Sequence, residues 1–178
     1  MSFEPIGEAI TIDKMAFGKR LLQEARLGLE LARQALRLKP NVSIMSNVPI
    51  PTLMIFAFVM MIYRKPWVLW HQDVQAIAIK SFAGDKLGKG FLVAAKGIEL
   101  GERWCSRRAA AIVVIADSFV DVHRQWKSAD KVTVIPNWAP LDEIYPVERH
   151  NKWSGEQGLN DIKTIVYSGT LGLKHNPE

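Results

Sequence analysis

The stretch that decides the fold is Ala111-Ile-Val-Val-Ile-Ala-Asp-Ser-Phe119. Its first part, from Ala111 to Ala116, is an unbroken apolar run, as expected of a strand that is covered on both faces. Asp117 and Ser118 follow directly, and both residue types favour the start of a helix. The stretch therefore predicts a buried strand that leads into a helix, with Ser118 as the helix N-cap.

The segments on either side continue this alternation of helix and strand. Working outward, we expect helices at 16–38, 52–63, 90–108 and 118–126, and strands at 42–45, 67–71, 111–116 and 131–135. Helices that alternate with strands are typical of a parallel sheet. We therefore expect an α/β fold, a Rossmann-like parallel sheet with helices on both faces.

The composition limits the class of protein and its compartment. Residues 40–63 carry no charge, a length that could span a membrane. Because Pro49 and Pro51 interrupt this run, we expect a strand and a buried helix rather than a membrane span. The single cysteine, Cys105, and the lack of a secretory leader favour the cytoplasm. A net charge of +5 favours anionic partners. No zinc-ligand spacing or ribonucleoprotein motif points to nucleic acid.

The first expected helix has one leucine-rich face and one basic face. The residues expected to point inward are Phe17, Leu21, Leu22, Ala25, Leu29, Ala32 and Leu36. The basic residues opposite them are Lys19, Arg26, Arg33 and Arg37. The simpler interpretation is a solvated face, and the alternative is peripheral contact with the anionic inner surface of the cytoplasmic membrane.

The rhythm of helix and strand breaks after residue 137. Residues 138–161 contain Pro140, Pro146, Gly155 and Gly158, which favours an interdomain linker. We expect an irregular N-terminal segment at 1–15, an incomplete first domain at 16–137, this linker, and the start of a second domain at 162–178. The expected second domain opens with a strand at 163–168 and a glycine turn.

Four motifs, taken in order, resemble retaining glycosyltransferases of the GT-B architecture, family-4-like group 1, of the polysaccharide-biosynthesis type. They are Trp67-Val-Leu-Trp-His-Gln-Asp73, Ala111–Phe119, Lys131-Val-Thr-Val-Ile-Pro-Asn137 and Val166-Tyr-Ser-Gly-Thr-Leu-Gly-Leu-Lys-His175. The resemblance implies two Rossmann-like domains that face a cleft. It also implies a nucleotide-diphosphate sugar as donor, a lipid-linked or glycan acceptor, and no metal or other cofactor.

The resemblance implies roles for particular residues. His71 and Asp73, at a strand end, would orient the acceptor hydroxyl as catalytic residues. The alternative is that Asp73 caps a loop and His71 is hydrogen-bonded in the cleft wall. Asn137 would shape the domain crossover.

The donor side would use residues near the end of the sequence. Gly169, Thr170 and Lys174 would meet the donor diphosphate, and the alternative is a plain turn with a solvated lysine. Thr170 stands where many members carry arginine. The family's upstream glycine-rich loop and downstream paired glutamates lie outside residues 1–178, so we expect a chain truncated at both ends and inactive alone. The alternatives are a nucleotide-sugar epimerase of the same fold and a non-catalytic α/β binding or membrane-surface module.

Overall fold

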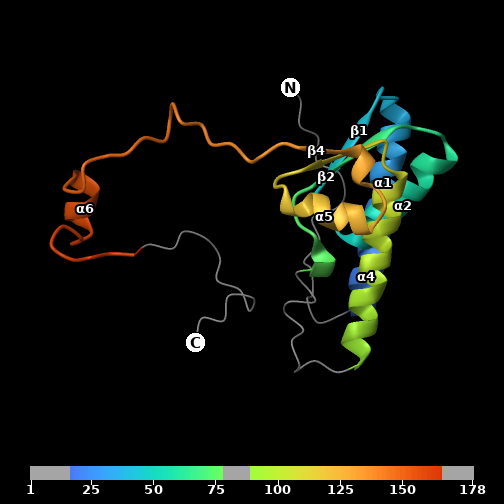
Figure 1. Ribbon diagram of the computed structural model, residues 1–178, viewed down its shortest axis with the longest axis horizontal. Helices are drawn as coiled ribbons and strands as arrows, with labels where there is room; N and C mark the ends of the chain where they lie inside the picture. The colour runs from blue at the N-terminus through green and yellow to red at the C-terminus, as the bar shows by residue number, and fades with distance from the viewer. Residues whose placement is uncertain (1–16, 78–88, 166–178) are drawn as a thin grey trace. The chain divides into compact units, whose positions relative to one another are not determined.

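The computed structural model describes residues 17–77 and 89–165, and its contacts divide the chain into two units, Met1–Pro136 and Asn137–Glu178. The helices of the first unit are α1 (Phe17–Leu38), α2 (Ile50–Ile62), α4 (Lys89–Arg108) and α5 (Ser118–Gln125), and its strands are β1 (Ser43–Ser46), β2 (Trp67–His71), β3 (Ala111–Val114) and β4 (Val132–Val134) (Figure 1). A short 3-10 helix, Ala129–Lys131, precedes β4. The second unit contains α6 (Lys152–Glu156).

The four strands form one parallel sheet in the order β1-β2-β3-β4. Met45 pairs with Leu69, Leu69 with Ile112, and Ile112 with Val132, so one row of apolar residues crosses all four strands. The predicted α/β class, a Rossmann-like parallel sheet flanked by helices, is confirmed.

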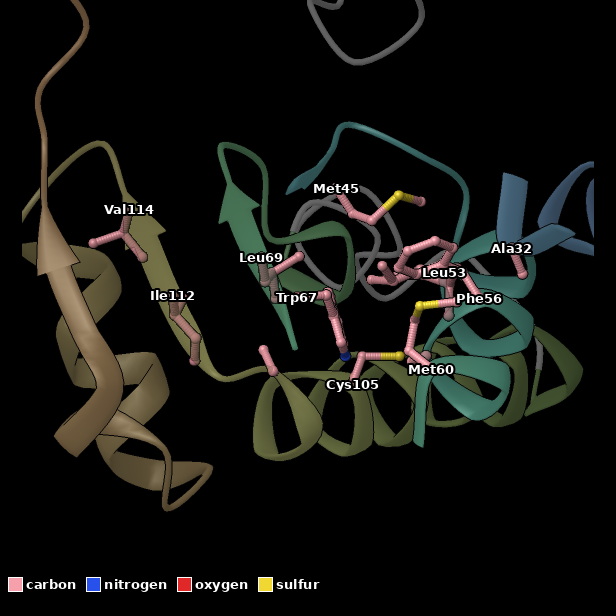
Figure 2. Packing of buried hydrophobic residues seen from close by; sticks show 13 residues of the cluster. Ala32, Met45, Leu53, Phe56, Met60, Trp67, Leu69, Cys105, Ile112 and Val114 are labelled. Carbon is pink, nitrogen blue, oxygen red and sulfur yellow. The ribbon is translucent and has the colours of Figure 1, made fainter. Parts of the chain in front are cut away.

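The hydrophobic core lies between the sheet and the helices α2 and α4 (Figure 2). Alternate residues of β2 and β3 are buried, as the period of a strand requires: Trp67 and Leu69 on β2, Ile112 and Val114 on β3. On α2, the ring of Phe56 meets the ring of Trp67 edge to face, with centroids 5.9 Å apart. Cys105 of α4 is fully buried in the same cluster. The core therefore fixes where β2 ends, and the carboxyl end of β2 carries His71.

Helix α1 packs on α2 most closely at small residues, while the predicted inward residues Ala32 and Leu36 lie in or against the core. Gly28 and Ala32 are buried, whereas Leu21, Leu22 and Leu29 are 56%, 64% and 47% exposed. The leucine-rich inward face is therefore wrong for these three residues. A Cβ placed on Gly28 would lie 2.7 Å from the Thr52 carbonyl oxygen, so only glycine lets the two backbones approach this closely. The basic residues of α1 are exposed, and their contact with a membrane stays a prediction.

The close approach at Gly28 leads to a paired prediction. Gly28→Ala is expected to lower the free energy of unfolding by about 1–3 kcal/mol, because backbone and Cβ atoms of α2 would have to shift. Gly97→Ala on α4 is the control, since a Cβ there meets nothing within 4 Å. Alanine is the better helix former, so this variant should gain up to about 1 kcal/mol. Urea unfolding of both variants measures the difference, and equal shifts would contradict the contact.

Two local expectations end differently in the structure. The helix α5 begins at Ser118, but Asp117 occupies the N-cap position, so the prediction of Ser118 as N-cap is wrong. Asp117 already has helical dihedral angles, φ −60° and ψ −32°, and its side chain makes no capping hydrogen bond. Over 40–63, where the sequence favours a strand and a helix over a membrane span, the structure has β1 and α2. Within residues 17–77 and 89–165, no helix is long and apolar enough to cross a bilayer.

The second unit holds a small folded turn inside the range predicted as a linker. Asn151 accepts a hydrogen bond from the Ser154 backbone N–H, and the Ser154 hydroxyl accepts one from the Asn151 N–H, which is a capping box for α6. Residues 137–150 before it are all exposed. Residues 163–165, the described part of the strand predicted from Lys163, do not form a strand, and Ile165 is fully exposed. Its remaining residues lie outside the described ranges, and the predicted domain boundaries stay predictions.

Candidate functional site

A cavity of about 120 Å³ lies at the carboxyl ends of β1 and β2. This is the edge at which open parallel sheets bind ligands. Its lining residues come from β1, β2, α2, α4 and the loops after both strands: Met45, Asn47, Val48, Ile50, Leu53, Leu69, Trp70, His71, Gln72, Asp73, Gln75 and Glu102. The cavity is therefore built entirely from the first unit.

Amide side chains join the two loops that form the rim of the cavity. Asn47 has a positive φ of 51°, a conformation that asparagine tolerates better than most residues, and its Nδ2 donates to Gln72 Oε1 at 2.5 Å. Gln75 Nε2 donates to the Val48 carbonyl oxygen at 3.3 Å. The loop after β1 and the loop after β2 are thus held together by neutral donors and acceptors.

His71 ends β2 and is almost completely buried. Its Nδ1 lies 3.1 Å from Nε2 of His123, so one of these two nitrogens donates a hydrogen bond to the other. Its ring stacks on Trp126, with centroids 6.0 Å apart and an interplanar angle of 30°. The imidazole is therefore fixed on its inner side by α5 and the residue that follows it.

His123 of α5 connects His71 to Ser128 in the interior. It is fully buried, and its Nδ1 lies 3.1 Å from the Ser128 hydroxyl oxygen. Burial, and to a smaller extent electrostatic repulsion by His71, lowers the pKa of His123 to about 4. At neutral pH His123 is therefore an uncharged ring with one donor nitrogen and one acceptor nitrogen.

Glu102 of α4 places a carboxylate beside His71. It is 1% exposed, and its two oxygens accept hydrogen bonds from the backbone N–H groups of Gln75 and Ala76 at 2.7 and 3.0 Å. Its Oε1 lies 3.6 Å from His71 Nε2, beyond hydrogen-bond range. Burial, and then the charge of Glu102, raises the pKa of Cys105 to about 12, so this thiol stays protonated in the core.

The structure brings two of the predicted site residues together. His71 and Asp73 both line the cavity, His71 in its buried floor and Asp73 as an exposed side chain. Asn137 is exposed and belongs to the second unit, and Ser118 does not line the cavity. The predicted donor residues Gly169, Thr170 and Lys174 lie outside the described residues.

Three residues around His71 were missed from the sequence: Glu102, His123 and Ser128. For Glu102 a signal exists, since it lies four residues after Ile98 and three before Cys105, both of which pack in or against the core. An acid on the inward face of a helix points to a buried partner. His123 and Ser128 carry no comparable sequence signal, because their link to His71 comes from the sheet order alone.

The cavity suits an uncharged polar ligand better than a phosphate. Among the described residues, its polar lining consists of amides, one imidazole and two carboxylates, without lysine or arginine. Phosphate sites in proteins are built with cations, oriented N–H groups or both. Within 17–77 and 89–165, no cluster of three or more His, Cys, Asp and Glu could hold a metal ion.

The fold and the cavity define an α/β protein with a small cavity of mixed polar and apolar lining at the carboxyl edge of a parallel sheet. Comparison with protein-family models and with curated proteins gave no match. The function is therefore argued from the site.

Proposed function

We propose that this chain carries the acceptor-side part of a retaining GT-B glycosyltransferase that acts in cell-surface polysaccharide biosynthesis. The observation that supports the proposal most is the cavity at the carboxyl ends of β1 and β2, which has a neutral and acidic polar lining. Such a lining is complementary to the hydroxyl groups of a sugar. The reaction would move a sugar from a nucleotide-diphosphate sugar to a lipid-linked or glycan acceptor.

In this reaction the bond between the anomeric carbon and the diphosphate oxygen breaks. The acceptor oxygen bonds to the same face of the anomeric carbon, and its proton passes to the leaving phosphate. His71 and Asp73 would therefore orient the acceptor hydroxyl and need not act as strong bases. On the donor side, Gly169 and Thr170 would approach the diphosphate, and the Lys174 ammonium would balance the charge that develops on it.

The proposal is tested on the purified 178-residue chain with two measurements. Saturation-transfer NMR with glucose, galactose and N-acetylglucosamine is expected to detect sugar binding that Asp73→Ala weakens. Asp142→Ala, which changes an exposed aspartate of the second unit, is the matched control. Incubation with radiolabelled nucleotide-diphosphate sugars is expected to give no sugar transfer, because the donor-gripping part of the family lies beyond these residues.

Each contrary outcome favours a different alternative. Absence of sugar binding would favour a non-catalytic module, and conversion of the nucleotide sugar without an acceptor would favour an epimerase. Sugar transfer by this chain alone would contradict the assignment of donor binding to a part outside it. The coding region on both sides offers an independent check, where the proposal expects a glycine-rich strand end upstream and paired glutamates downstream.

A further inference from the structure

Four buried polar side chains form a row that leads from the interior to the cavity, which His71 and Glu102 line. The row runs from Ser128 through His123 and His71 to Glu102. Ser128 and His123 belong to α5 and the turn after it, His71 to β2, and Glu102 to α4. The titratable groups that face His71 are thus His123 and Glu102, while Phe119 and Trp126 face it with uncharged rings and Asp73 lines the same cavity.

The carboxylate at one end decides the direction of the row. Glu102 accepts and does not donate, so a bare Nε2 on His71 would point a lone pair at an anion 3.6 Å away. A proton on Nε2 removes this repulsion. In neutral His71, Nδ1 is then an acceptor and takes the His123 Nε2–H, which leaves His123 Nδ1 as an acceptor. The Ser128 hydroxyl can donate to this Nδ1 at 3.1 Å or to the His123 carbonyl oxygen at 3.4 Å, and the shorter contact favours Nδ1.

A hydroxyl group between His71 and Glu102 would satisfy the donor on one side and the acceptor on the other. At 3.6 Å, Nε2 and Oε1 are too far apart for a direct hydrogen bond, and both residues line the cavity. A hydroxyl can accept from Nε2–H and donate to Oε1 at the same time. A phosphate oxygen could accept from Nε2–H, but the negative charge of the phosphate is repelled by the Glu102 carboxylate.

We propose that His71 Nε2–H and Glu102 Oε1 form a hydroxyl-binding pair, that Glu102 sets the tautomer of His71, and that His123 and Ser128 are positioning residues that orient the His71 ring. The proposal deepens the proposed function, since a sugar acceptor supplies such a hydroxyl. The tautomer itself does not depend on that function, so the two can fail separately.

The tautomers are measured by long-range proton–nitrogen NMR of the ¹⁵N-labelled chain at pH 8. The sequence has four histidines, and His71→Gln assigns the His71 signals. Both His71 and His123 are expected to carry the proton on Nε2 and to have a bare Nδ1. A proton on His71 Nδ1 together with a bare Nε2 would overturn the proposal.

Two variants test which residues set the arrangement. Glu102→Gln is expected to leave His71 and His123 in a mixture of both tautomers, whereas Glu99→Gln on the same helix leaves them unchanged. Unchanged tautomers in Glu102→Gln would overturn the role of the carboxylate. Ser128→Ala is expected to shift the His123 Nδ1 resonance and to keep the proton on His71 Nε2.

Ser106→Ala is the control for Ser128→Ala. Ser106 is also fully buried, and its hydroxyl has no hydrogen-bond partner in the described part of the chain. This variant should leave both histidines as in the unmodified chain. If the His123 Nδ1 resonance does not move in Ser128→Ala, the hydrogen bond between His123 and Ser128 is overturned. This measurement can still be made if Glu102→Gln does not fold.

The ligand class is tested by adding N-acetylglucosamine or inorganic phosphate and following the His71 signals. The sugar is expected to shift them in a saturable manner and to bind about tenfold more weakly to Glu102→Gln. Phosphate is expected to leave them unmoved. A response to phosphate alone, or to neither probe, would overturn the hydroxyl-binding pair even if the tautomers are as proposed.

Discussion

Phe56→Ala is expected to lower the free energy of unfolding by about 3–5 kcal/mol, the range found when a buried phenylalanine is truncated in a core. Phe56 is 1% exposed and lies in the cluster between α2 and the sheet. Its ring meets Trp67 edge to face at an interplanar angle of 86°. Alanine would leave a void that the close contacts of α2 with α1 and α4 prevent from closing.

Urea unfolding followed by circular dichroism measures this loss. Phe58→Ala is the matched control, because it removes the same ring from the same helix where the side chain is 49% exposed. Its effect should stay below about 1 kcal/mol. Similar midpoints for the two variants would mean that the core is not centred on Phe56 and Trp67. The loss also bears on the site, since Trp67 and His71 belong to the same strand.

Acidification is expected to destabilise the protein by about 3 kcal/mol between pH 6.5 and pH 4 through His123 alone. The pKa of this residue falls from 6.5 to about 4 on folding, mainly because the ring is buried. Between these pH values the unfolded chain binds a proton that the folded chain does not bind, so stability falls with the pH. The full contribution is present above pH 6.5, and the loss is complete below about pH 4.

The measurement compares the pH dependence of urea unfolding for the unmodified chain and for His123→Gln, which does not titrate. The difference between the two curves removes the contribution of carboxylates elsewhere in the chain. It should change by about 3 kcal/mol over this range. His150→Gln, a change at an exposed histidine, should follow the unmodified chain. A difference curve that is flat between pH 6.5 and pH 4 would contradict a buried neutral His123.

The strands were the most predictable part of the fold. Residues 67–71 form a strand with the bounds that the sequence predicts, because a short apolar run between a proline and polar residues leaves little other choice. The helix expected at 90–108 begins one residue earlier, at Lys89. The parallel order of the strands predicts the sheet edge at which the cavity lies, and His71 and Asp73, which the sequence places at that edge, line it. Their role as site residues stays a prediction.

The remaining features depend on contacts between elements, which local sequence patterns do not carry. The periodicity of α1 correctly places Ala32 and Leu36 on the inward face, but the close approach to α2 at Gly28 leaves Leu21, Leu22 and Leu29 exposed. In the sequence, Glu102 is one of several acidic residues on a helix. Only the structure shows that its carboxylate accepts hydrogen bonds from the N–H groups of Gln75 and Ala76. The helix α6 has only five residues, too few for a periodic pattern.

The strand order has a consequence for how the protein is made. Each strand of β1-β2-β3-β4 pairs with the strand that precedes it in the sequence, so no strand has to insert between two that are already paired. During synthesis, each new strand can therefore pair with the strand made before it, so that the sheet grows in one direction. Glu102 is synthesised before His123. The contact of His71 with Glu102 can therefore form before its contact with His123.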